Sequence, residues 1–142
     1  MTTLREAFAR ARDEDRAALI AYLPAGFPDP QTSVALFQAV VAGGADIVEV
    51  GLPYSDPLMD GPVIQEAADM ALRAGTRPPD VIRIAGDVAK TGAATLVMSY
   101  WNPIERYGVQ EFASQLSQVG GSGVITPDLT PEEAGPWTDR KS

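Results

Sequence analysis

The chain has 142 residues, of which 45% are hydrophobic, and this is enough for one domain with a buried core. Its formal net charge is −8 and it has no basic cluster or stripe, which argues against a nucleic-acid-binding surface. Because there is no cysteine and no histidine, disulfides, thiolate chemistry and cysteine metal sites are excluded, and any acid–base chemistry must use carboxylates, tyrosines or lysines.

The first residues of the chain are rich in charge and contain no apolar signal-peptide core. No apolar run reaches the roughly 20 residues that a membrane-spanning helix needs. We therefore expect a soluble, cytoplasmic protein that does not contact a membrane.

The first half of the chain contains two predicted strands. Leu4, Phe8 and Ala11 recur at helical spacing, which predicts an amphipathic helix over residues 4–13. The apolar run at residues 17–23 predicts a strand that ends in a proline-rich loop. The elements expected after it are a helix that stops at a glycine pair (31–44), a strand (46–51), a loop (52–61) and a helix that stops at Gly75 (62–74).

The second half repeats this order. Residues 77–92 begin with prolines and end with glycine, which is typical of a helix. The elements expected after it are a strand (93–99), a loop (100–108), a helix with a glycine stop (109–121), a strand and turn (122–128) and the start of another helix (131–137).

Strand and helix thus alternate four times, and the strands are short and apolar, as in a parallel sheet with both faces covered. A doubly wound sheet and a (β/α)₈ TIM barrel both fit this α/β pattern. No G-x-G-x-x-G motif follows a strand, and each strand ends in a polar or proline-rich loop, which favours a barrel. Since a complete barrel needs roughly 250 residues, we interpret residues 1–142 as the N-terminal half of a single barrel domain, truncated or frameshifted.

Glu49 interrupts the second predicted strand, where an unpaired ionised carboxylate would be costly. Side chains alternate along a strand, so Glu49 shares a face with Ile47, whereas Val48 and Val50 point to the helices. Glu49 is therefore expected on the barrel lumen near the strand's carboxyl end. Poor solvation there favours the protonated form and suits a group that exchanges a proton near neutral pH. The alternative is a structural carboxylate paired with a buried basic residue, and we favour the catalytic role.

Other polar side chains near the strand ends have simpler explanations as well. Asp60 precedes the helix at 62–74 and could be its N-cap, and Asp128 could equally be a cap. Asp56 precedes a proline, which is typical of an Asx turn. Tyr22 and Tyr100 are expected at strand ends, where they could pack in the core or line a pocket for a flat ligand.

Four segments together resemble one enzyme family. "DIVEVGLPYSDPLMDGPVIQ" closely resembles the signature of the tryptophan synthase α subunits. "AYLPAGFPD", "VMSYWNPIERYGVQEF" and "PDLTPEE" resemble the first, third and fourth strand ends of that family, so the similarity covers nearly the whole chain. The resemblance implies a (β/α)₈ lyase that cleaves indole-3-glycerol phosphate to indole and glyceraldehyde 3-phosphate, with no metal or organic cofactor.

The resemblance also implies roles for particular residues. Glu49 matches the general acid/base, and Asp60 matches the carboxylate that binds the indole N–H. The positions around the indole ring are matched by Tyr22, Met98 and Tyr100. The loop at residues 53–60 matches the contact with the β subunit of an α2β2 heterotetramer, and the implied contact residues are Pro53, Asp56 and Asn102.

The chain departs from the family in two ways. The family's phosphate-binding groups and closing loop belong to the second half of its barrel, and residues 134–142 differ from the helix expected after the fourth strand. We therefore expect the chain alone to be inactive and, because two sheet edges would be exposed, to associate. The alternatives are a non-catalytic half-barrel that binds a partner or itself, and another phosphate-binding barrel such as a sugar-phosphate epimerase or aldolase.

Overall fold

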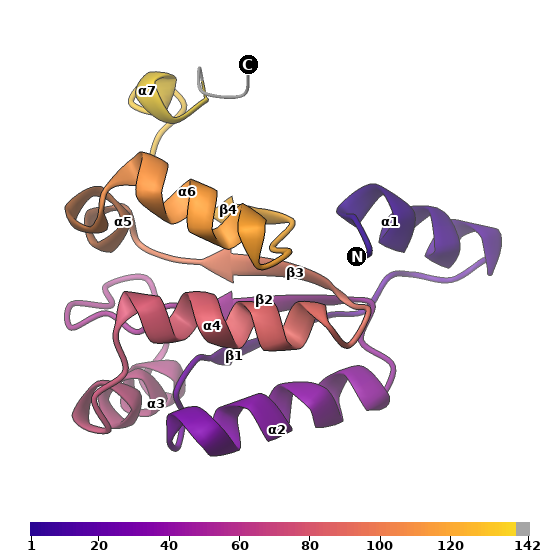
Figure 1. Cartoon of the computed structure of the whole chain (residues 1–142), viewed down its shortest axis with the longest axis horizontal. Coiled ribbons are helices and arrows are strands. Elements are labelled where there is room, and N and C mark those ends of the chain that lie inside the picture. The colour runs from indigo at the N-terminus through magenta and orange to yellow at the C-terminus, as the bar shows by residue number, and fades with distance from the viewer. Residues whose placement is uncertain (139–142) are drawn as a thin grey trace.

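Four short strands form one parallel sheet in the order β1-β2-β3-β4 (Figure 1). The computed structural model describes residues 1–138. The strands are β1 (Ile20–Pro24), β2 (Ile47–Gly51), β3 (Ala94–Met98) and β4 (Gly123–Ile125). Each strand pairs with the next one along the chain, so the predicted series of four parallel βα units is confirmed.

Seven helices lie within residues 1–138, and they separate into two groups around the sheet. They are α1 (Leu4–Asp13), α2 (Pro30–Ala42), α3 (Pro62–Arg73), α4 (Pro78–Ala89), α5 (Trp101–Tyr107), α6 (Val109–Gln118) and α7 (Gly135–Thr138). The helices α2, α4 and α6 pack against one face of the sheet through the main hydrophobic core. In Figure 1, α1 lies at the right, by the amino ends of the strands, whereas α3 and α5 lie at the left, by their carboxyl ends.

The helix starts follow from local sequence. Thr3 and Glu6 form a reciprocal capping box at α1, and the Asp29 carboxylate accepts hydrogen bonds from the first backbone N–H groups of α2. The helices α2, α3 and α4 each begin with proline, whose missing N–H costs nothing in the first turn. These features explain why the helices predicted at residues 4–13, 31–44, 62–74 and 77–92 are confirmed within a few residues.

The loop predicted at residues 100–108 is wrong, because α5 occupies most of it. Pro103 falls in the first turn of α5, where a helix tolerates proline. The backbone N–H of Trp101 donates to both carboxylate oxygens of Asp128, at 2.9 and 3.1 Å. The cap therefore comes from the loop after β4, and the local sequence could not reveal it.

The helix predicted to start at residue 131 is also wrong. Residues 131–133 form a turn in which the N–H groups of Glu133 and Ala134 both donate to the carbonyl of Thr130. Pro136 has no N–H to donate to the carbonyl of Glu132, so the turn does not continue as an α-helix, and α7 (Gly135–Thr138) begins separately with Pro136 in its first turn. Only α7 forms here, and residues 139–142 of the divergent C-terminal segment lie outside the described residues.

The strand register determines which side chains share a face. Tyr22 lies opposite Glu49 and Glu49 opposite Leu96, so these three side chains form one row on the inner face. Val48 and Val50 point the other way, into the core formed with α2, α4 and α6, as predicted. The amino-terminal part of the inner face is covered by Leu4 and Ala7 of α1, which pack with Ile47, Ala94 and Leu96.

Within residues 1–138, the outer edges of β1 and β4 have no strand partner. Leu19 and Ile20 beside the β1 edge are about half exposed, at 53% and 46%. A cavity of about 810 Å³ lies along β4 and α6, lined in part by Val109, Leu116 and Ile125. In a closed barrel both edges are paired, so these surfaces match the two open sides of a barrel segment.

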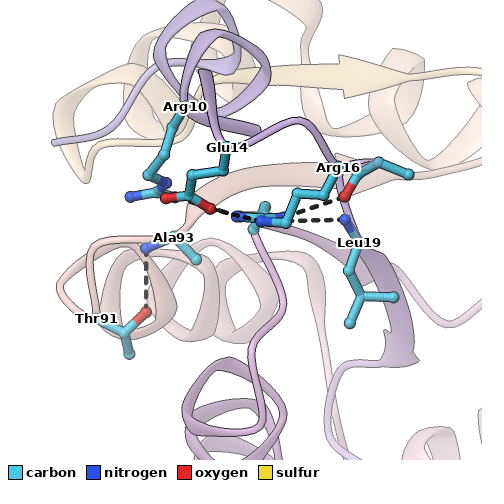
Figure 2. A network of polar contacts seen from close by, with 8 residues as sticks. Arg10, Glu14, Arg16, Leu19, Thr91 and Ala93 are labelled. Atoms are coloured by element: carbon cyan, nitrogen blue, oxygen red, sulfur yellow. Dashed lines mark hydrogen bonds and ion pairs between the residues drawn. The ribbon is translucent and has the colours of Figure 1, made fainter. Parts of the chain in front are cut away.

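An ion pair joins the connection between α1 and β1 to the start of β2 (Figure 2). The Arg16 guanidinium donates to both oxygens of the buried Asp46 carboxylate, at 2.7 and 2.8 Å, and also to Glu14 at 2.6 Å. The backbone N–H of Leu19 donates to the same carboxylate at 2.9 Å, and Arg10 lies 3.6 Å from it. The Arg16 guanidinium, helped by the Leu19 N–H, holds the pKa of Asp46 well below its usual range.

We predict that Asp46→Asn lowers the free energy of unfolding by about 2 kcal/mol at neutral pH, because the bidentate charged hydrogen bonds are lost. Folding lowers the pKa of Asp46, so the stability that the ion pair supplies is complete above about pH 4 and declines as the pH falls below it. When the free energy of unfolding is measured with urea at a series of pH values, it should therefore fall less toward acid pH for Asp46→Asn than for the original chain.

The matched control is Asp69→Asn, which removes an exposed ion pair with Arg73 and should change stability little. An Asp46→Asn chain as stable as the original at pH 7 would contradict the assignment.

Candidate active site

The inner face carries two half-buried titratable side chains near the carboxyl end of the sheet. Glu49 is half-buried in β2, and Tyr22, directly opposite it in β1, is half-buried as well. Burial raises the pKa of the Tyr22 phenol, and the negative charges of Asp60 and Glu49 raise it further. The charges of both Glu49 and Asp60 therefore reach the Tyr22 phenol.

Gly51 makes room for Tyr22. A Cβ atom at position 51 would overlap the hydroxyl, Cζ and Cε2 atoms of the Tyr22 ring. The Tyr22 ring therefore crosses the carboxyl end of β2 only because residue 51 has no side chain. Gly51 was not among the residues predicted for the site, although a glycine inside a strand signals close approach by another group.

Asp60 lies in the loop after β2 and does not cap α3. The N-cap of α3 is Gly61, which makes no side-chain cap hydrogen bond. The Asp60 carboxylate instead accepts a hydrogen bond from the Tyr100 hydroxyl at 3.2 Å, and the Tyr100 oxygen accepts one from the Met59 N–H at 2.9 Å. The simpler explanation of Asp60 as a helix cap is therefore wrong, and its carboxylate faces the site.

Tyr100 and Met98 lie at the end of β3. The Tyr100 ring is buried, with 5% of its surface exposed. Burial raises the pKa of the Tyr100 phenol; the Met59 N–H opposes this effect and the Asp60 charge adds to it. Met98 is half-buried and pairs in register with Gly51, so it lies on the same face as Tyr22 and Glu49, one row closer to the carboxyl edge.

The residues predicted to contact a partner come from the loop after β2 and from α5, and they differ in exposure. Pro53 is buried, and Asp56 is exposed. Asn102 is exposed on α5, and its Nδ2 donates to the Tyr54 hydroxyl at 3.0 Å. Pro53 and Asn102 both line a cavity of about 440 Å³. Among the described residues the Asp56 carboxylate accepts no hydrogen bond, so the predicted Asx turn is not formed there.

Few other groups within residues 1–138 are candidates for a functional role. Across residues 1–138 there is no cluster of three acidic side chains that could hold a metal ion. None of the helices in that range is long and apolar enough to cross a membrane. Asp128 is a helix cap, since it receives the Trp101 N–H of α5. The carboxylates that remain for chemistry on the inner face are Glu49 and Asp60.

Four parallel βα units, with polar side chains gathered at the carboxyl ends of the strands, define a protein of the (β/α)₈-barrel class, whose sites lie at that end. A family model described as "Tryptophan synthase alpha chain" matches residues 8–141. The chain therefore belongs to the tryptophan synthase alpha chain family, as its sequence motifs suggested.

Individual relatives agree with this assignment. The tryptophan synthase alpha chain of Thermobifida fusca is 64% identical over 137 residues, which are 96% of this chain and 51% of the relative. That of Acidothermus cellulolyticus is 56% identical, with the same coverage of both chains. The chain spans about half the length of the curated relatives that it matches.

Solved structures give the same result for the fold. The aminoacrylate-bound form of tryptophan synthase from M. tuberculosis superposes with a TM-score of 0.94 at 49% identity, over 98% of this chain and 57% of that one. The tryptophan synthase alpha subunit from Legionella pneumophila gives 0.92 at 36% identity, over 98% and 54%. The predicted barrel-type fold, with this chain covering about half of such a barrel, is thus confirmed.

We predict that Gly51→Ala moves the Tyr22 ring out of the site, because the new methyl group and the ring cannot share the space. A displaced and hydrated Tyr22 should titrate near the ordinary tyrosine pKa of about 10. Phenolate absorbance against pH, with Tyr22→Phe as the reference that identifies the Tyr22 step, measures the change.

Gly61→Ala is the matched control, since a Cβ there meets no atom within 4 Å. It should leave the Tyr22 titration unchanged, and an unchanged titration in Gly51→Ala would refute the steric argument.

Proposed function

We propose that these residues carry the catalytic carboxylates of a tryptophan synthase α-type lyase, which cleaves indole-3-glycerol phosphate to indole and glyceraldehyde 3-phosphate. The observations that carry the proposal are that Glu49 and Tyr22 lie side by side near the carboxyl end of the inner face, and that Tyr100, just after β3, binds the Asp60 carboxylate at the same end of the sheet. Membership of the family supports the same reaction class. A non-catalytic half-barrel is not favoured, because no observation requires it.

The reaction is a retro-aldol cleavage that conserves protons overall. A proton is added to the indole ring carbon that bears the glycerol side chain, and a proton is removed from the neighbouring hydroxyl. The carbon–carbon bond then breaks, its electrons restore the indole ring, and the hydroxyl carbon becomes an aldehyde. A single carboxyl group that gives one proton and takes the other can serve both steps, and a half-buried carboxyl group at the substrate is suited to this work.

We assign the proton transfers to Glu49 and the stabilisation of the indole N–H to Asp60. Protonation of the ring carbon develops positive charge on the indole nitrogen, and an ionised carboxylate beside it lowers the energy of that state. The Asp60 carboxylate accepts a hydrogen bond from the Tyr100 hydroxyl at 3.2 Å.

The indole ring of the substrate is flat and apolar, so its binding site needs apolar side chains that contact the ring. Tyr22 and Met98 lie on the same face as Glu49 and offer such surfaces, and the Tyr100 ring lies behind Asp60. The proposed reaction uses acid–base chemistry alone and requires no metal or organic cofactor.

We also propose that the face carrying Pro53, Asp56 and Asn102 contacts a tryptophan synthase β subunit within an α2β2 assembly. Pro53 and the exposed Asn102 line one cavity, and a cavity edged by an exposed polar side chain fits a protein contact. The loop between Pro53 and Asp60 would then link that contact to Asp60. The cytoplasmic location expected from the sequence stays a prediction.

Residues 1–142 are proposed to form the first half of one barrel domain. Within residues 1–138 no glycine-rich strand end offers the phosphate cradle that the substrate needs, and we expect that cradle in the other half of the barrel. A complete site therefore requires a longer chain. The sharpest test joins this chain, at the end of the matched region, to the second half of the Thermobifida fusca relative.

In that chimera we predict that Glu49→Gln lowers the turnover of indole-3-glycerol phosphate by on the order of 10²–10⁴-fold, because the amide keeps the shape but cannot exchange the proton. Indole release measures the rate. Glu66→Gln, on the exposed face of α3, is the matched control and should be fully active. Equal indole production by the Glu49→Gln chimera would sink the assignment.

Asp60→Asn is predicted to lower turnover strongly while changing the melting temperature little. Asp60 does not cap α3, so the loss of about 1 kcal/mol expected for a missing cap should not occur. Thermal unfolding and indole release are measured on the same chimera preparation. A destabilised variant with normal turnover would show that Asp60 serves the fold and not the chemistry.

A further inference from the structure

Tyr100 connects the end of β3 to the loop after β2. Its hydroxyl oxygen accepts the backbone N–H of Met59 at 2.9 Å, and its proton goes to the Asp60 carboxylate at 3.2 Å. Since the Met59 N–H already occupies one side of the oxygen, the hydroxyl proton is directed toward Asp60. One phenol group thus holds both the backbone and the side chain of this loop end.

The same segment of chain holds the other end of the loop. The Tyr100 ring packs against the Tyr54 ring with centroids 5.2 Å apart, and Asn102 Nδ2 donates to the Tyr54 hydroxyl at 3.0 Å. The loop that carries Asp60 is therefore attached at both ends to residues that follow β3, about 40 positions further along the chain.

Little else secures the tip of this loop. Leu58 and Met59 are exposed, at 81% and 60%, so their side chains do not anchor it by burial. The Gln65 side chain donates to the carbonyls of Pro57 and Asp60, which restrains the backbone and leaves the Asp60 carboxylate free to turn. Among the described residues only the Tyr100 hydroxyl donates a hydrogen bond to that carboxylate.

We infer that Tyr100 is a positioning residue, whose hydroxyl sets the orientation of the Asp60 carboxylate and holds the loop tip at Met59. Its hydrogen bond occupies Oδ2 of Asp60 and leaves Oδ1 to accept an N–H group of a ligand. This differs from a role as a wall of the indole pocket, because the buried ring presents its polar atom to the loop. The value of this positioning for catalysis rests on the proposed function, whereas the hydrogen bonds of Tyr100 with Asp60 and Met59 do not depend on it.

The test uses Tyr100→Phe in the 142-residue chain itself, which keeps the ring and removes only the hydroxyl. Hydrogen exchange of the Met59 amide should accelerate by roughly five- to tenfold, the factor that one lost hydrogen bond represents. The three-bond NMR scalar couplings that report χ1 of Asp60 should change from the values of a single rotamer to values averaged over several rotamers. Packing alone would move neither signal, since Phe preserves the contact with Tyr54.

Tyr107→Phe is the matched control, because it removes a phenol hydroxyl of α5 that bonds Gln115 and not the loop. It should leave the Met59 amide and the Asp60 rotamer unchanged. Asp60→Asn should keep the Met59 amide protected, since that N–H bonds Tyr100 directly. Unchanged exchange and couplings in Tyr100→Phe, or equal changes in Tyr107→Phe, would overturn the inference.

Hydrogen exchange and side-chain couplings are measured without substrate turnover, so they test the positioning role of Tyr100 separately from the proposed lyase function. If the loop loosens in Tyr100→Phe but the chimera releases no indole, the positioning role stands and the proposed function fails. If the chimera is active and the Tyr100→Phe chain keeps its loop, the positioning role fails alone.

Discussion

The structure depends first on the contact between Asp46 and the segment that enters β1. The Asp46 carboxylate binds the Arg16 guanidinium and the Leu19 N–H, while the Asp46 N–H donates to the Leu19 carbonyl at 2.9 Å. This fastens the start of β2 to the residue before β1 and so helps to set the register of the first strand pair. Because side chains alternate along a strand, a slip of one residue would turn Glu49 into the helix-covered core.

This register determines which side chains lie on each of the two faces of the sheet, and the two faces have different roles. The face of Val48 and Val50 is sealed by helices and supplies the stability of the domain. The opposite face is covered by α1 only toward the amino ends of the strands, and toward the carboxyl ends it carries Tyr22 and Glu49. Glu49 is only half-buried there, so its carboxylate keeps part of its contact with water, and it forms no ion pair within residues 1–138.

The loop after β2 takes part in both proposed functions. It carries Asp60, and it also carries Pro53 and Asp56, two of the residues proposed to meet a partner. Both ends are fastened by the segment after β3, through Tyr100 and Asn102. A partner that moved Asn102 or Tyr54 would therefore shift the surroundings of Asp60 through a few hydrogen bonds. Coupling between a subunit contact and the chemistry needs only such a short path, since the loop has few other attachments.

The sequence by itself determined the order of the four strands and of the helices α1, α2, α3, α4 and α6, the face of Glu49 and the family, because periodicity, caps and motifs are local properties of the chain. It did not reveal the cap of α5 by Asp128, the bond from Tyr100 to Asp60, or the ion pair of Arg16 with Asp46. Each of these joins residues about 27 to 40 positions apart. Only the folded sheet brings such partners within hydrogen-bonding distance, so tertiary structure alone decided whether Asp60 caps a helix or faces the site.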